Sequence, residues 1–366
     1  MTTQTAQTTT PAPPAELDEA ALMAFVFRAV DEVGASLNCA LVVMGDRLGY
    51  YRALADRGPL TAPELAQATG TGERYAAEWL NAQAAGAFVT YDPATGRYTL
   101  PPEHVVALTD ESSPAFLPGF FQIAFGTISD AAQIFDRARA GDGLGWGDHN
   151  HDVHEGCERF FRPSYAANLL PSWLPALTDV VPKLERGARV HDLGCGHGAS
   201  TVLMAEAFPA STFVGSDAHG ESIGVARERA IEAGVSDRVE FEAVTSTAVT
   251  GSGYDLVTVF DALHDMGDPV GCARRVHDLL ADDGTWMIVE PAAGDRIEDN
   301  LNPVGRAYYG FSTLLCTPAS LSQDVGLAIG TQAGPARIRD IVTAAGFTQF
   351  RIAAQTPFNN VLEVRK

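Results

Sequence analysis

The stretch RVHDLGCGHGAS, residues 189–200, organises the rest of this chain. A short apolar strand leads into Gly194, Gly196 and Gly198, and a helical pattern begins directly after the third glycine. Glycine permits a tight turn and lets a ligand approach the main chain, while the first N–H groups of a helix lack an intrahelical partner. The stretch therefore predicts a ligand-binding turn where a strand ends and a helix begins.

The segments after this turn alternate between strand-like and helix-like patterns. Continuous apolar strands joined by amphipathic helices are typical of a parallel sheet that helices cover on both faces. The gap between the last two strands is too short for a helix, so they predict an antiparallel hairpin at the sheet edge. The expected strands are ARVHDLG (188–194), TFVGSD (212–217), VEFEAV (239–244), YDLVTVFD (254–261), TWMIVEP (285–291), FTQFRIAAQTPF (347–358) and NNVLEVRK (359–366).

Composition narrows the class of protein. A chain of 366 residues exceeds one typical core, so two domains are expected. The formal net charge of -21 repels polyanions and argues against nucleic acid as a partner. The five cysteines are odd in number and form no C-x-x-C pair, which favours a reducing compartment over disulfides or a structural zinc. No signal-peptide pattern or membrane-spanning run is present, so we expect a cytoplasmic protein without membrane contact.

The segment before the sheet predicts a winged helix over residues 36–109. Two helices, the second over residues 73–85, are followed by two strand-like runs around PATG, a hairpin turn. Thr61 is the expected N-cap of the first of these helices. Residues 1–110 contain six Arg and no Lys against 13 Asp and Glu. This domain therefore cannot neutralise phosphates as a DNA-binding protein must. We expect it to pair two subunits into a homodimer.

Two long segments are expected to lie over the sheet domain. Residues 111–185 are rich in aromatic residues and predict a helical connector, and residues 292–334 lack a regular period and predict a lid. The connector contains GWGDHNHDVHEGCERFF (145–161), whose histidine spacing matches no closed metal site, so we expect a pocket-lining loop and no metal. The side chains expected to touch a substrate are Trp146, His149, His151, Tyr165, Tyr309 and Phe311.

The sequence of the glycine turn is compatible with more than one kind of ligand. Gly194, Gly196 and Ala199 fit G-x-G-x-x-G/A, and Asp217 ends the next strand 23 residues after Gly194, where a dinucleotide fold places its ribose-binding carboxylate. Against a dinucleotide, Asp192 precedes three alternate glycines, and the sheet ends in a hairpin instead of a second mononucleotide unit.

Three stretches carry a resemblance to a known family: VHDLGCGHG (190–198), GSD (215–217) and YDLVTVFDALHD (254–265). Over residues 188–366 the chain resembles the class I S-adenosylmethionine-dependent methyltransferases. The resemblance implies an α/β Rossmann-like sheet of seven strands in the order 3-2-1-4-5-7-6, with strand 7 antiparallel, behind an N-terminal α-helical winged-helix domain. The implied domains are a disordered tail (1–15), a winged-helix and dimerisation domain (16–110), the connector (111–185), and a catalytic domain (186–366) with the lid. The implied cofactor is S-adenosylmethionine, and S-adenosylhomocysteine is its product.

The resemblance also implies which residues hold this cofactor. The glycine turn would approach the methionine part, and Asp217 would accept both ribose hydroxyls. The family often has an acidic residue for adenine after the third strand, but this chain has Thr245 and Ser246 there. The implied cofactor residues are Asp192, Gly194, Cys195, Gly196, Gly198, Asp217, Ala218, Thr245, Ser246, Phe260 and Asp261.

The whole chain is similar to the dimeric small-molecule O-methyltransferases of plants and actinobacteria, whose fourth strand leads into His-Asp-Trp-x-Asp. Here His264 and Asp265 occupy that motif, with Met266 in place of Trp, and Glu290 follows at the end of the fifth strand. The resemblance implies that His264 is the general base and that Glu290 orients it, a task that suits an imidazole near neutral pH.

We therefore expect a methyltransferase acting on a small, aromatic or natural-product-like acceptor at a hydroxyl oxygen. Three alternatives stay open: an N- or C-methyltransferase that needs no base, a winged-helix regulator that senses a ligand without turnover, and a nicotinamide dehydrogenase.

Overall fold

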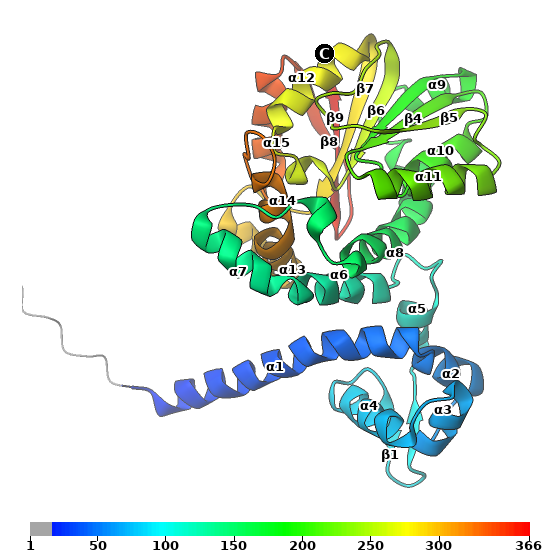
Figure 1. Ribbon diagram of the computed structural model, residues 1–366, viewed down its shortest axis with the longest axis vertical. Coiled ribbons are helices and arrows are strands. Elements are labelled where there is room, and N and C mark those ends of the chain that lie inside the picture. Colours follow the sequence, from blue (N-terminus) through cyan, green and yellow to red (C-terminus); the bar gives the residue numbers. More distant parts are fainter. Residues whose placement is uncertain (1–16) are drawn as a thin grey trace, which may run out of the picture.

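A seven-stranded sheet forms the centre of the carboxyl-terminal domain in the computed structural model, which describes residues 17–366 (Figure 1). The predicted disorder of residues 1–15 therefore lies outside the described residues. The strands are β3 (Arg189–Leu193), β4 (Thr212–Asp217), β5 (Val239–Ala243), β6 (Tyr254–Phe260), β7 (Leu280–Pro291), β8 (Gln349–Gln355) and β9 (Asn359–Arg365).

The strand order confirms the predicted topology. The strands lie in the order β5-β4-β3-β6-β7-β9-β8, which is 3-2-1-4-5-7-6 when the seven are counted along the chain. The first five pair in parallel, whereas β9 is antiparallel to both β7 and β8. Because β3 lies next to both β4 and β6, the chain changes direction at β3, and a crevice opens beyond the carboxyl ends of these strands.

Helices cover both faces of the sheet, as the continuous apolar strands predict. One buried cluster joins α9 (Val180–Arg186), α10 (Ala199–Ala207) and α11 (Gly220–Glu232) to the sheet. A second cluster joins α12 (Pro269–Leu279) and α15 (Gly334–Ala344) to the opposite face.

The amino-terminal part forms the predicted winged helix. Its elements are α1 (Glu19–Arg47), α2 (Tyr50–Arg57), α3 (Ala62–Thr69), α4 (Glu73–Ala85), β1 (Thr90–Asp92), β2 (Arg97–Thr99) and α5 (Pro102–Thr109). Thr61 caps α3 in a reciprocal capping box with Glu64, which confirms the predicted N-cap. The strands β1 and β2 form an antiparallel hairpin. In the described part of the chain, no helix combines the length and the apolar character that crossing a bilayer requires.

The connector consists of α6 (Pro118–Ser129), α7 (Ala131–Ala140), η1 (Trp146–Asp148), α8 (His151–Asn168) and the π-helix η2 (Leu169–Trp173). Figure 1 shows α6 and α8 lying between the sheet domain and α1. Arg159 on α8 binds Asp46 on α1 at 2.7 Å, so ion pairs fasten the connector to α1.

Residues 292–334 contain more regular structure than their sequence predicts. They form η4 (Ile297–Asn300), α13 (Pro303–Phe311), the π-helix η5 (Ser312–Cys316) and α14 (Thr317–Leu321). A π-helix inside a helical run changes which side chains share a face, and such segments recur at functional sites. The expected lid is thus largely helical.

Candidate functional site

The glycine turn after β3 needs glycine at each alternate position. Gly194, Gly196 and Gly198 have φ angles of 67°, 52° and 75°, in the left-handed region that other residues rarely adopt. A Cβ on Gly198 would also meet the ring of Phe241 at 2.8 Å. Gly198 therefore serves the turn and the packing of α10, and Gly194 and Gly196 line a cavity.

Asp192 lies below this turn and not in the cavity. Its carboxylate accepts hydrogen bonds from the hydroxyls of Ser200, Thr201 and Thr258 at 2.6 to 2.8 Å. Burial raises the pKa of Asp192, and these three donors oppose that rise. Asp192, one of the implied cofactor residues, therefore does not line the cavity, and its carboxylate instead holds the start of α10 through side-chain hydroxyls.

Asp217 at the end of β4 lines the cavity beside the turn. Its Oδ2 accepts from the N–H of Gly196 at 3.0 Å, and its Oδ1 accepts from the N–H of His219 at 2.8 Å. Each carboxylate oxygen can accept a further hydrogen bond. Asp217 is thus held at the position where two neighbouring hydroxyl groups of a ligand could donate to it.

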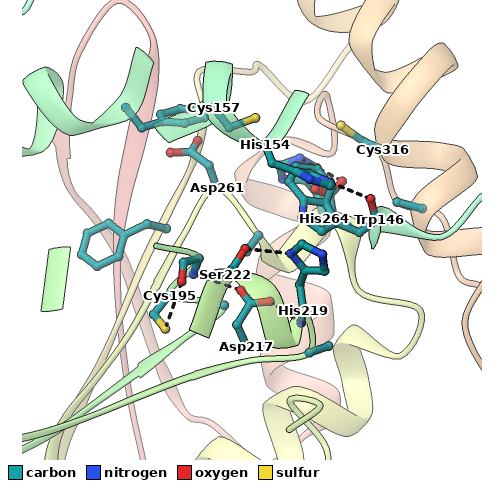
Figure 2. A pocket seen from close by; sticks show the side chains of 18 of the residues that line it. Trp146, His154, Cys157, Cys195, Asp217, His219, Ser222, Asp261, His264 and Cys316 are labelled. Atoms are coloured by element: carbon teal, nitrogen blue, oxygen red, sulfur yellow. Dashed lines mark hydrogen bonds and ion pairs between the residues drawn. The ribbon is translucent and has the colours of Figure 1, made fainter. Parts of the chain in front are cut away.

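The cavity has a volume of about 490 Å³ and lies between the sheet, the connector and the helices of residues 303–321. It extends from the glycine turn to the imidazole of His264 (Figure 2). The predicted residues that line it are Gly194, Cys195, Gly196, Asp217, Ala218, Thr245, Ser246, Phe260, Asp261, His264, Asp265, Trp146, Tyr165 and Phe311.

Three predicted substrate residues do not line this cavity. His149 is buried beneath it, with Nδ1 at 3.2 Å from Asp130, because α8 begins at His151 where a loop is expected. His151 is exposed on the first turn of that helix. Tyr309 points away because Tyr308 faces the cavity, and neighbouring residues of a helix differ by about 100° in direction.

His264 and Glu290 form a buried pair at the carboxyl ends of β6 and β7. His264 Nδ1 lies 2.6 Å from Glu290 Oε2, and Glu290 Oε1 accepts from the N–H of Leu263 at 3.0 Å. An imidazole that donates from Nδ1 keeps a lone pair on Nε2. Burial opposes a charge on the ring, but Glu290 and Asp265 outweigh it and raise the pKa of His264 well above its usual value.

Asp261 is the strained residue of this site. Its φ angle is +48°, and its Oδ1 accepts from the side chain of Asn359 at 2.8 Å. Its Oδ2 is buried and has no hydrogen-bond partner among the described residues. Burial raises the pKa of Asp261 well above its ordinary value, and Glu290 adds to the effect. A strained backbone and an unsatisfied buried oxygen together mark a position that a ligand completes.

Several cavity residues have no clear signal in the sequence. His154 and His219 are two of them: their rings lie 4.8 Å apart, beside the predicted Trp146 (Figure 2). His154 Nε2 lies 2.9 Å from the carbonyl of Trp146, so this imidazole is engaged with the backbone. The three histidines of residues 149–154 therefore do not converge on one point.

Two family models match the chain. Residues 184–326 match the methyltransferase domain, and residues 36–110 match the Rv2258c-like winged HTH domain. Among curated proteins, the ubiquinone biosynthesis O-methyltransferase of Bordetella avium is 33% identical over 134 residues, which span 36% of this chain and 52% of that relative. The chain thus spans about half the length of this relative.

Solved structures share the fold over nearly the whole chain. Human N-acetylserotonin methyltransferase in complex with S-adenosylmethionine has a TM-score of 0.69 at 15% identity, with 97% of this chain and 99% of that chain covered. An O-methyltransferase from neocarzinostatin biosynthesis, solved with S-adenosylmethionine and 2-hydroxy-5-methyl naphthoic acid, has a TM-score of 0.60 at 16% identity, with 90% and 95% covered. The two family models confirm the predicted resemblance to a methyltransferase domain that follows a winged-helix domain, and the solved structures show the same fold.

Proposed function

We propose that this protein transfers a methyl group from S-adenosylmethionine to a hydroxyl oxygen of a small aromatic acceptor. One observation carries the proposal: Glu290 holds Nδ1 of His264 at 2.6 Å, and the same imidazole lines the cavity that begins at the glycine turn. A base and a nucleotide-type turn thus share one cavity, which is the arrangement that base-assisted transfer requires.

The cofactor would lie along the carboxyl ends of β3, β4 and β6. Asp217 would accept the ribose hydroxyls, and the glycine turn would admit the methionine part. Asp261 Oδ2, which lacks a partner among the described residues, offers an acceptor for the α-ammonium group. Thr245 and Ser246 line the adenine end of the cavity, where their hydroxyls can meet polar ring atoms.

The acceptor would lie between the connector and the helices after β7. This part of the cavity is lined by Phe120, Phe160, Tyr165, Phe311 and Leu315, and the rings of Phe120 and Phe311 lie 5.3 Å apart. In the transfer, the acceptor oxygen forms a bond to the methyl carbon while the bond from that carbon to sulfur breaks. S-adenosylhomocysteine leaves with the electron pair, and Nε2 of His264 takes the hydroxyl proton.

The experiment is incubation of the full chain with S-adenosylmethionine and a panel of phenols, with mass spectrometry of both products. We expect stoichiometric S-adenosylhomocysteine and a methyl ether. Methyl transfer confined to nitrogen or carbon acceptors would favour the alternative without a base, and NMR of the product distinguishes the methylated atom. Salt-sensitive DNA binding without turnover would favour the regulator.

The carboxylates around His264 predict a pH dependence. Only the neutral imidazole can accept a proton, and the neighbouring carboxylates raise its pKa, so kcat/KM should rise with pH through a value above the usual imidazole range. Glu290→Gln removes one of these charges, which lowers the pKa and moves the rising limb to lower pH by about 1 to 3 pH units. The maximal rate falls as well, because the orientation of the ring is lost.

A matched variant separates this effect from general damage. Glu242→Gln changes a partly buried carboxyl on β5 that does not line the cavity, and its pH profile should coincide with that of the wild type. If the rise of kcat/KM with pH in Glu290→Gln occurs at the same pH as in the wild type, Glu290 does not control the pKa of the titrating group.

The winged-helix domain offers the surface for a homodimer. Large apolar side chains along α1 are exposed, and contiguous apolar surface of this kind is typical of subunit interfaces. They are Leu22, Met23, Phe25, Val26, Phe27, Val30, Val33 and Leu37. We propose that α1 pairs with α1 of a second copy, and light scattering of the full chain should give the dimer mass, which Phe25→Glu with Val30→Glu should reduce to the monomer mass.

A further inference from the structure

One wall of the cavity brings together three side chains that commonly bind metal ions. His264, Asp265 and Cys316 each offer one ligand atom, and these atoms all lie within 4.8 Å of one another. His264 and Asp265 follow β6, whereas Cys316 ends the π-helix η5. All three line the cavity, so an ion can reach them from the side on which ligands would bind. Figure 2 shows His264 and Cys316 of this cluster.

One ligand atom of this cluster, Oδ1 of Asp265, is buried without a hydrogen-bond partner among the described residues. It lies 3.4 Å from Nε2 of His264. Nδ1 of the same ring is taken by Glu290. A proton on Nε2 can bridge this nitrogen and Oδ1 of Asp265, and a metal ion bound to both atoms would take the place of that proton.

The surroundings of the cluster favour a cation. Among the described residues that line the cavity, Arg162 is the only Lys or Arg, against Glu158, Asp217, Asp261 and Asp265. A cavity with apolar walls and a surplus of acidic groups attracts cations. The cluster therefore lies where the local field attracts a divalent ion.

The donor set selects the kind of ion. Imidazole and thiolate bind zinc and similar transition metals, whereas magnesium and calcium prefer oxygen ligands alone. Glu290 supplies the outer contact that usually orients a metal-binding histidine through its second nitrogen. Three protein ligands leave a fourth position open toward the cavity, as in zinc sites that exchange a water or a substrate atom.

We propose that His264, Asp265 and Cys316 bind a Zn²⁺ ion, and that the ion switches methyl transfer off by occupying Nε2 of His264. The binding is independent of the proposed function, whereas the inhibition rests on it. Zinc takes the lone pair that would accept the acceptor's proton, and the thiol proton of Cys316 passes to solvent when the ion binds.

The binding test uses Co²⁺ as a spectroscopic substitute for zinc on the full chain freed of metal. A thiolate ligand gives Co²⁺ an intense near-ultraviolet charge-transfer band, and we expect one equivalent of Co²⁺ to produce it and one of Zn²⁺ to remove it. Cys316→Ser and Cys316→Ala should abolish the band, and Asp265→Asn should weaken affinity about 10- to 100-fold or more. Cys157→Ala is the matched control, because Cys157 lines the same cavity outside the cluster.

Several results would overturn the site. Absence of the band in the wild type, its persistence in both Cys316 variants, its loss in Cys157→Ala, or equal competition by Mg²⁺ would each do so. The wild-type spectrum tests the site without any substitution, so the proposal can be refuted even if a variant fails to fold.

The inhibition is measured separately, as the ratio of methyl transfer with zinc to transfer with a chelator, for each variant against its own metal-free rate. We expect zinc to inhibit the wild type and Cys157→Ala but not Cys316→Ala. A charge-transfer band without inhibition would support the metal site and refute the proposal that zinc switches methyl transfer off. Absence of methyl transfer under any condition would instead count against the proposed function and leave the spectroscopic result standing.

Discussion

His264→Ala should lower kcat/KM for methyl transfer to a hydroxyl by about 10²- to 10⁴-fold, the usual contribution of a positioned base. The ring is buried, its Nδ1 is held by Glu290, and no other imidazole that lines the cavity is oriented by a carboxylate in this way. Affinity for S-adenosylmethionine should change little, because His264 lies beyond the glycine turn. The measurement is steady-state kinetics together with calorimetric titration of the cofactor.

His151→Ala is the matched control for this substitution. His151 is exposed on α8 outside the cavity, so its variant should keep the wild-type rate. Undiminished transfer to a hydroxyl by His264→Ala would refute the role of His264 as base. The N- and C-methyltransferase alternatives predict that outcome for their own acceptors, because those nucleophiles need no proton removal.

Asp217→Asn should weaken binding of S-adenosylmethionine and S-adenosylhomocysteine about 10- to 100-fold, without a comparable loss of fold stability. Hydrogen bonds to a charged acceptor contribute about 1.5 to 3 kcal/mol, against about 0.5 to 1.5 kcal/mol for a neutral one, and two ribose hydroxyls would donate here. The asparagine oxygen can still accept from the N–H of Gly196 or His219, which preserves the loop. Calorimetry gives both dissociation constants.

Cofactor and product should lose affinity equally in this variant, since they share the ribose. Asp237→Asn, an exposed carboxyl on the segment before β5, serves as the control and should bind as the wild type does. No binding of S-adenosylmethionine to the wild type would remove the basis of the proposal. Tight binding of reduced nicotinamide cofactor, followed by its fluorescence, would favour the dehydrogenase.

The sequence determined the sheet and the turn, because both depend on local signals. Three alternate glycines predicted a turn that only glycine adopts easily, and all three have left-handed backbones. The short gap between the last two strands predicted the antiparallel hairpin of β8 and β9, since no crossover helix fits there. The family resemblance implied that Glu290, at the end of the fifth strand, orients His264, and the structure brings their side chains to 2.6 Å.

The sequence predicted Trp146, Tyr165 and Phe311 in the cavity, but the tertiary structure decided which of the other side chains in the connector and in residues 292–334 face it. Asn150 caps α8, so His149 pairs with Asp130 and His154 meets Trp146 instead of joining a common site. The π-helix η5 carries Cys316 to His264, a contact between segments far apart in the chain. Side-chain direction in irregular helices depends on packing against distant elements, and a single sequence does not record that packing. For the same reason, the turn identifies where the methyl donor would bind, whereas the acceptor wall and its metal-binding cluster exist only in the folded chain.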